Sequence, residues 1–173
     1  MYYPELKLFP PVLIVYCDDS EQYPTSVGLL AQGAAYHWYV MPDDEWLNNS
    51  YSLSTKEHLT LDYLDQVGDP KDYIFDHISD LTSGYELLHT FNVPRTTKLL
   101  QQINYEDSHS RNEDNIMFKL KNIAALVPER YQKRFSKEMD ISTDRERLNP
   151  EHADDTCIAA VWTVLRLSGI QQC

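Results

Sequence analysis

The sequence predicts an α/β fold in which one mixed sheet is flanked by helices, and three observations support this. Residues 12–16 read Val-Leu-Ile-Val-Tyr, a run that suits a strand buried in the middle of a sheet. Two more strand-like runs follow at short spacing, which indicates an antiparallel meander. Beyond residue 54 the apolar side chains recur at helical spacing, with one further strand-like run among them. Sheet and helices should therefore pack in layers.

The predicted meander comprises residues 12–16, 26–31 and 35–40. Gly33 permits a tight turn between the second and third strands, and Pro42 with the two following aspartates ends the third.

The second half of the chain is predicted to be mainly helical. Ser54 or Thr55 would cap a helix over residues 54–66, and Gly84 would end a second helix over 70–82. We expect a buried strand over 85–91 and further helices over 96–103, 116–126, 128–137 and 154–167. Residues 104–115 and 138–150 are polar, and 104–115 is predicted to be a mobile surface loop or a helix extension.

Length and composition narrow the class of protein. The 173 residues predict a single domain over 1–173, with its core at about 12–167. No apolar run approaches the roughly 20 residues of a membrane span, so no membrane association is expected. The N-terminus lacks the features of a secretory signal, and three scattered cysteines predict reduced thiols in a cytoplasmic protein.

The charge is strongly acidic but unevenly distributed. A net charge of −12 argues against sequence-independent duplex binding and suits a basic protein partner. Six of the fifteen basic residues nevertheless fall within 119–137, as the solvated face of a helix or as an edge that faces phosphates. The candidates for contact with nucleic acid in this segment are Lys133, Arg134 and Lys137.

Acidic residues follow the first strand directly. Asp18, Asp19 and Glu21 are costly to crowd together unless a cation or a proton neutralises them, so they are candidates for a Mg²⁺ site. The alternative is a solvated, Asp-rich turn that closes the strand.

Several segments together resemble the DEDD-type (DEDDh-like) 3′–5′ exonucleases, over about residues 12–167. Residues 13–21 are similar to the first motif, a strand ending in Asp-x-Glu, with Asp19 and Glu21 at the motif spacing. Residues 58–64 resemble the His-x-Ile-Thr-x-x-x-Leu helix, and residues 87–92 resemble the strand that ends in His-Asn. Residues 151–156 resemble the final His-x-Ala-x-x-Asp motif before an apolar helix.

This resemblance implies a ribonuclease-H-like mixed sheet and hydrolysis of phosphodiester bonds in short or single-stranded DNA or RNA. Two Mg²⁺ or Mn²⁺ ions would activate a water and stabilise the leaving oxygen. Asp19, Glu21 and Asp155 would hold the metal, and His152 would be the general base. Further candidates are Asp18, Asp154, His89, Asn92 and Arg95. The resemblance also raises the expectation of a homodimer.

The chain also departs from the family pattern. Pro94 and Arg95 stand where the second-motif acid is expected, and His152 precedes Asp155 by three residues instead of five. The guanidinium of Arg95 would supply positive charge without metal chemistry. Two hypotheses therefore remain: a divergent exonuclease, or an inactive ribonuclease-H-like protein that binds a partner. Trp46 and Tyr51, in the loop after the third strand, are candidates for stacking on bases.

Overall fold

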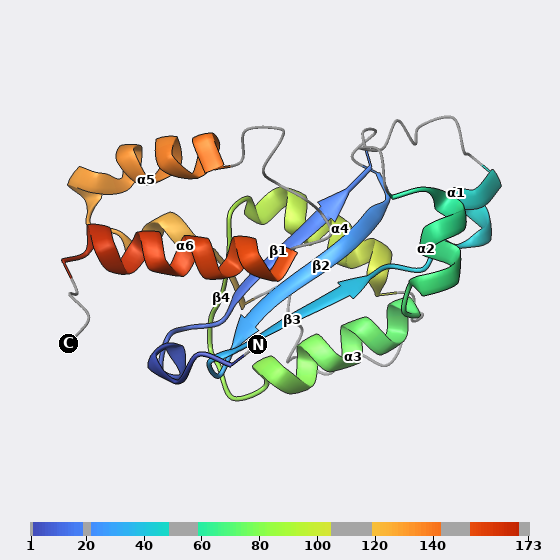
Figure 1. Cartoon of the computed structure of the whole chain (residues 1–173), viewed down its shortest axis with the longest axis horizontal. Coiled ribbons are helices and arrows are strands. Elements are labelled where there is room, and N and C mark those ends of the chain that lie inside the picture. The colour runs from blue at the N-terminus through green and yellow to red at the C-terminus, as the bar shows by residue number, and fades with distance from the viewer. Residues whose placement is uncertain (1, 19–21, 49–58, 105–118, 143–152, 170–173) are drawn as a thin grey trace.

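The fold is built on a five-stranded mixed sheet with strand order β3-β2-β1-β4-β5 (Figure 1). The computed structural model describes residues 2–18, 22–48, 59–104, 119–142 and 153–169. The strands are β1 (Val12–Cys17), β2 (Pro24–Ala31), β3 (Ala34–Tyr39), β4 (Leu88–Thr90) and β5 (Leu120–Asn122). β1, β2 and β3 pair antiparallel, whereas β4 pairs parallel to β1 and β5 parallel to β4. The predicted α/β class and meander are confirmed.

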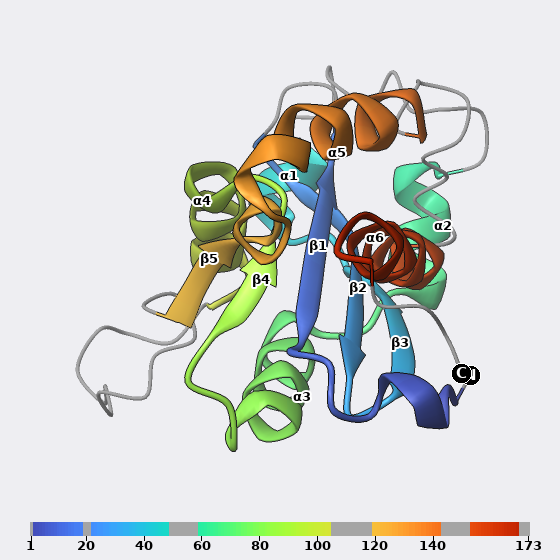
Figure 2. The same ribbon diagram turned by 90° about the vertical axis from the view of Figure 1, so that its left-hand side faces the viewer.

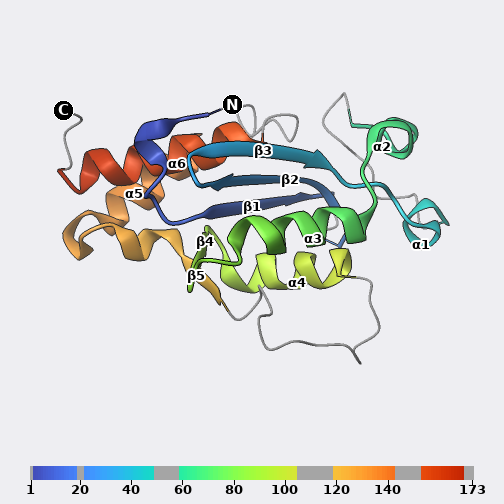
Figure 3. The ribbon, with the colours of Figure 1, turned by 90° about the horizontal axis from the view of Figure 1, so that it is seen from below.

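Helices cover both faces of this sheet. α6 lies across the meander on one face with α5 beside it, and α3 and α4 lie on the other face (Figures 2 and 3). α1 and α2 lie beyond the end of β3 (Figure 1). The helices are α1 (Asp44–Asn48), α2 (Leu61–Val67), α3 (Lys71–Thr82), α4 (Val93–Ile103), α5 (Glu129–Ser142) and α6 (Ala153–Leu167), with short 3-10 turns η1 (Pro4–Leu6) and η4 (Ile123–Leu126).

The central strand supplies core residues to both layers. Val12 and Ile14 of β1 pack on the α6 side, while Leu13 and Val15 pack on the α3 and α4 side. This alternation follows from the period of two in a strand, and it explains why β1 has no polar position before its end.

The turn between β2 and β3 forms as predicted. Gln32 and Gly33 both have positive φ angles, 54° and 79°, which is the backbone of a two-residue type I′ hairpin turn. Gly33 adopts this conformation without the steric cost that a Cβ would bring.

Three expectations about elements need correction. The helix expected over 116–126 is wrong: residues 120–122 form β5, because Leu88 and Leu120 pair across two parallel strands, and residues 123–126 form η4. The strand expected over 85–91 is limited to β4. The helix expected over 54–66 is described only as α2, which is capped by the Thr60 side chain, while Ser54 and Thr55 lie outside the described residues.

Two further observations bear on the class of protein. No helix in the described ranges combines the length and the apolar character needed to cross a membrane. Cys17 and Cys157 form no disulfide in the part of the chain that the structure describes, and Cys173 lies outside it.

Candidate functional site

The candidate site lies at the carboxyl end of β1, where the first turns of α6 and α4 approach the sheet. On the α6 face, the hydroxyl of Tyr16 lies 2.7 Å from the Thr156 Oγ1. On the α4 face, a terminal nitrogen of Arg95 lies 2.9 Å from the Cys17 Sγ. Segments far apart in sequence therefore meet where the sequence predicted a site.

A glycine on β2, Gly28, allows α6 to approach the sheet closely. A Cβ on Gly28 would lie 2.3 Å from the backbone carbon and oxygen of Ala153, so only glycine fits beneath the start of this helix. The Cys157 thiol donates to the Gly28 carbonyl at 3.4 Å. These contacts fix the first turn of α6, and with it the residues that face the end of β1.

The pair at this junction is neutral. Burial raises the pKa of Tyr16 well above its ordinary value, and this effect outweighs the opposing effect of the hydrogen bond with Thr156. The tyrosine therefore stays protonated at physiological pH, and both partners are hydroxyl groups. Sequence reasoning missed this pair, because a tyrosine in a strand and a threonine in a helix carry no charge or motif, whereas the acids near them do.

Asp18 has a structural role that its sequence position did not reveal. Its side chain is 3% exposed, and its Oδ1 accepts the backbone N–H groups of Gln22 at 3.0 Å and Tyr23 at 2.9 Å. The Asp18 N–H in turn donates to the Tyr23 carbonyl. This carboxylate closes the connection from β1 to β2, as the turn alternative expects, but it is buried and not solvated.

Arg95 and Asn92 belong to the first turn of α4. The Asn92 Oδ1 accepts the Arg95 N–H at 3.1 Å, so Asn92 is the N-cap of the helix. The cap fixes the start of α4, and the exposed Arg95 side chain reaches Cys17 from this turn.

The acids of α6 lie beside the neutral pair. Asp154 is half-buried and Asp155 is exposed, both in the first helical turn, where the helix dipole favours negative charge. Asp19, Glu21 and His152 lie outside the described residues, so their positions relative to Asp155 stay a prediction. Among the described residues, no group of three or more His, Cys, Asp or Glu side chains is placed to hold a metal ion.

The sheet register places His89 away from this site. His89 pairs with Val12 at the start of β1, about 17 Å along the strand from Cys17 at 3.3–3.4 Å per residue. It is 2% exposed, and burial lowers its pKa more than the hydrogen bond to Pro11 raises it. Its environment is that of a neutral core histidine.

The sequence also predicted aromatic residues that stack on bases and a basic segment that contacts nucleic acid. Trp46 is fully buried and stacks on Tyr23 with ring centroids 5.2 Å apart, so its expected role in stacking on bases is wrong. Tyr51 lies outside the described residues. Lys133, Arg134 and Lys137 are all exposed on α5. Lys133 and Lys137 lie on the side of the helix opposite buried Phe135, whereas Arg134 lies on a flank that faces Glu138.

Comparisons of the chain with protein-family models, with curated proteins and with solved structures found no match.

Proposed function

We propose that this chain is a ribonuclease-H-like protein that binds a partner and does not hydrolyse phosphodiester bonds. The fold supports the structural half of this proposal. The antiparallel meander, the parallel strands β4 and β5, and a final helix laid across the meander agree with the arrangement that the resemblance to DEDD-type exonucleases implies.

The Tyr16–Thr156 pair supports the functional half of the proposal, which is that the chain does not hydrolyse phosphodiester bonds. When the His-x-Ala-x-x-Asp motif is aligned on Ala153, the residue that packs on Gly28, Thr156 takes the position of the acid. Its partner on β1 is Tyr16, also uncharged. A two-ion site needs carboxylates that converge, because hard divalent cations prefer anionic oxygen ligands. A neutral, part-buried pair of hydroxyl groups does not supply this negative charge.

The start of α4 supports the same proposal. No acid occurs in residues 87–104, which includes β4 and the whole of α4. The first turn of α4 instead directs the Arg95 guanidinium to the end of β1. A fixed positive charge at this place opposes cation binding.

The class of partner follows from charge. The chain has 27 acidic and 15 basic residues, which favours a basic protein surface over a duplex. We therefore propose an accessory role in which the acidic surface binds a basic protein.

Thermal unfolding with and without Mn²⁺ tests the absence of a metal site. A competent site at about 100 times its dissociation constant stabilises the folded state by about 2.7 kcal/mol, which for a chain of this length raises the melting temperature by about 5–10 °C. We expect a change of less than about 1 °C, within the effect of a neutral surface substitution.

Incubation of a labelled single-stranded oligonucleotide with Mn²⁺ tests the chemistry directly, with Asp19→Ala as the matched variant. We expect no shortened products from either protein. A ladder that forms with the wild type and not with Asp19→Ala would overturn the proposal.

A divergent exonuclease that uses Mg²⁺ or Mn²⁺ is the second candidate, and one observation favours it. Asp155 adjoins Thr156, so one acid lies in the turn of α6 that contacts the end of β1. In this case Asp19 and Glu21 would meet Asp155, with His152 as base. The ladder experiment separates the two candidates.

A further inference from the structure

Three arginines from two helices meet at a pocket away from the candidate site. The pocket has a volume of about 240 Å³, and it lies between the start of α5 and the end of α6. Its lining includes Arg130, Arg134, Arg166, Tyr131 and Gly169. α6 extends about 21 Å from Ala153 to Leu167, at 1.5 Å per residue, so this pocket and the Tyr16–Thr156 junction lie at opposite ends of the helix.

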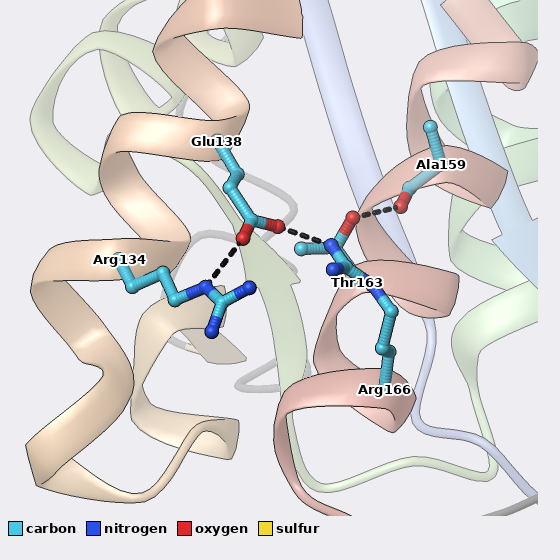
Figure 4. A network of polar contacts seen from close by, with 5 residues as sticks. All are labelled: Arg134, Glu138, Ala159, Thr163 and Arg166. Atoms are coloured by element: carbon cyan, nitrogen blue, oxygen red, sulfur yellow. Dashed lines mark hydrogen bonds and ion pairs between the residues drawn. The ribbon is translucent and has the colours of Figure 1, made fainter.

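A single carboxylate holds two of these arginines in position. Glu138 accepts hydrogen bonds from the Nε of Arg134 at 2.7 Å and from a terminal nitrogen of Arg166 (Figure 4). The hydrogen bond from Arg134 is the main reason that the pKa of Glu138 is lowered, with Arg166 acting in the same direction. Each guanidinium has five N–H donors, so both keep donors beyond those that Glu138 uses.

The third arginine is positioned by an aromatic ring. The Arg130 guanidinium carbon lies 4.7 Å from the centre of the Tyr131 ring, which is the geometry of a cation–π contact. Arg130 is one turn before Arg134 on α5, so the two side chains leave the same side of the helix.

The local charge suits a dianion. The three arginines and Glu138 together have a net charge of +2, although the net charge of the whole chain is −12. The helix dipole at the end of α6 explains one cation in its last turn, and an i,i+4 pair explains Arg134 with Glu138. Neither accounts for Arg130, or for the convergence of all three at one pocket whose described lining contains no acid.

We propose that this pocket binds a phosphate monoester. Planar guanidinium groups match phosphate oxygens in pairs, and arginine is the residue best suited to them. The volume is smaller than the usual 300–1,000 Å³ of a site for a whole ligand. The pocket therefore holds a phosphate with a small part of the molecule that carries it.

Isothermal titration with inorganic phosphate, at ionic strength held constant with chloride, tests the site. Arg130→Gln removes one pocket charge without touching Glu138. Lys133→Gln is the matched control, because Lys133 is exposed on the same helix, carries the same charge and does not line the pocket. We expect Arg130→Gln to weaken binding about tenfold and Lys133→Gln to weaken it less than about threefold.

Two results would overturn the proposal. One is no heat of binding at about 10 mM phosphate, well above a millimolar dissociation constant. The other is an equal loss in the two variants, which would indicate a diffuse charge effect. A dinucleotide with and without a 5′-phosphate identifies the source of the group. Tighter binding of the phosphorylated form than of inorganic phosphate assigns it to a nucleic acid end, and equal binding assigns it to a small phosphate ester. Neither result depends on the Mn²⁺ or ladder experiments.

Discussion

The hydroxyl pair at the end of β1 should contribute measurably to stability. Tyr16→Phe removes the hydrogen bond to Thr156 and leaves a part-buried hydroxyl without this partner, so unfolding should become easier by about 1 kcal/mol. Chemical denaturation of Tyr16→Phe, Thr156→Val and the double variant measures the coupling between the two groups.

Thr163→Val is the control for this cycle. It removes an exposed hydroxyl that bonds only the Ala159 carbonyl within α6 (Figure 4) and should cost less than about 0.5 kcal/mol. A coupling energy near zero between positions 16 and 156 would mean that the two hydroxyls do not interact in solution.

Burial of His89 should make stability depend on pH. Its folded-state pKa is lowered, so below the ordinary value of about 6.5 the unfolded chain binds more protons than the folded one. The stability contribution is therefore complete above about pH 6.5 and is lost as the pH falls toward the folded-state pKa.

The free energy of unfolding of the wild type and of His89→Gln, measured from about pH 5.5 to 7.5, tests this assignment. The slope should be smaller in the variant. The same slope in both proteins would show that other groups titrate in this window.

At the scale of elements, the close packing of α6 on β2 depends on Gly28. Gly28→Ala places a Cβ against the backbone of Ala153, and backbone cannot rotate away, so α6 must shift. We expect a loss of about 3 kcal/mol, the upper end of overpacking effects.

Gly84→Ala is the matched substitution, because a Cβ there meets nothing within 4 Å. Its effect should stay within about 0.5 kcal/mol, as at most surface positions. Similar unfolding midpoints for the two variants would mean that α6 does not sit this close to β2.

An element was predictable from the sequence where its side-chain pattern or turn signal is strong enough to be recognised locally. The apolar run of β1, the turn at Gly33 and the apolar side of α6 have local signals, and all three were predicted correctly. β5 has only three residues, and the spacing of Leu120 and Ile123 resembles one turn of a helix. Its pairing with β4 is a tertiary contact that no local pattern announces.

The candidate site was predictable in location but only partly in composition. Acids near the end of β1 and before α6 indicated that these segments meet, and the contact of Tyr16 with Thr156 shows that they do. The register that places His89 beside Val12 is a tertiary pairing of two parallel strands, which no local sequence pattern announces. Tyr16 and Thr156 carry no distinctive motif, so neither was selected.

At the scale of the whole molecule, the excess of acids should dominate the response to salt. Raising NaCl from about 0.01 to 0.15 M shortens the Debye length from about 30 to 8 Å, which weakens both repulsion and attraction between exposed charges. Exposed ion pairs such as Arg134–Glu138 are worth at most about 1 kcal/mol. With 27 acids and 15 bases, repulsive contacts outnumber these pairs, so the free energy of unfolding should rise with salt.

A variant that carries Asp65→Asn, Asp76→Asn and Asp80→Asn, all at exposed positions, lowers the net charge from −12 to −9 and should reduce the salt dependence. Chloride is the anion of choice, because sulfate and phosphate stabilise folded proteins by exclusion and would also bind a pocket lined by arginines. If stability instead falls with NaCl, the ion pairs of Asp43 with Lys71 and of Glu138 with Arg134 and Arg166 outweigh the repulsion. The acidic surface would then be balanced locally, and the case for a basic protein partner would lose its electrostatic support.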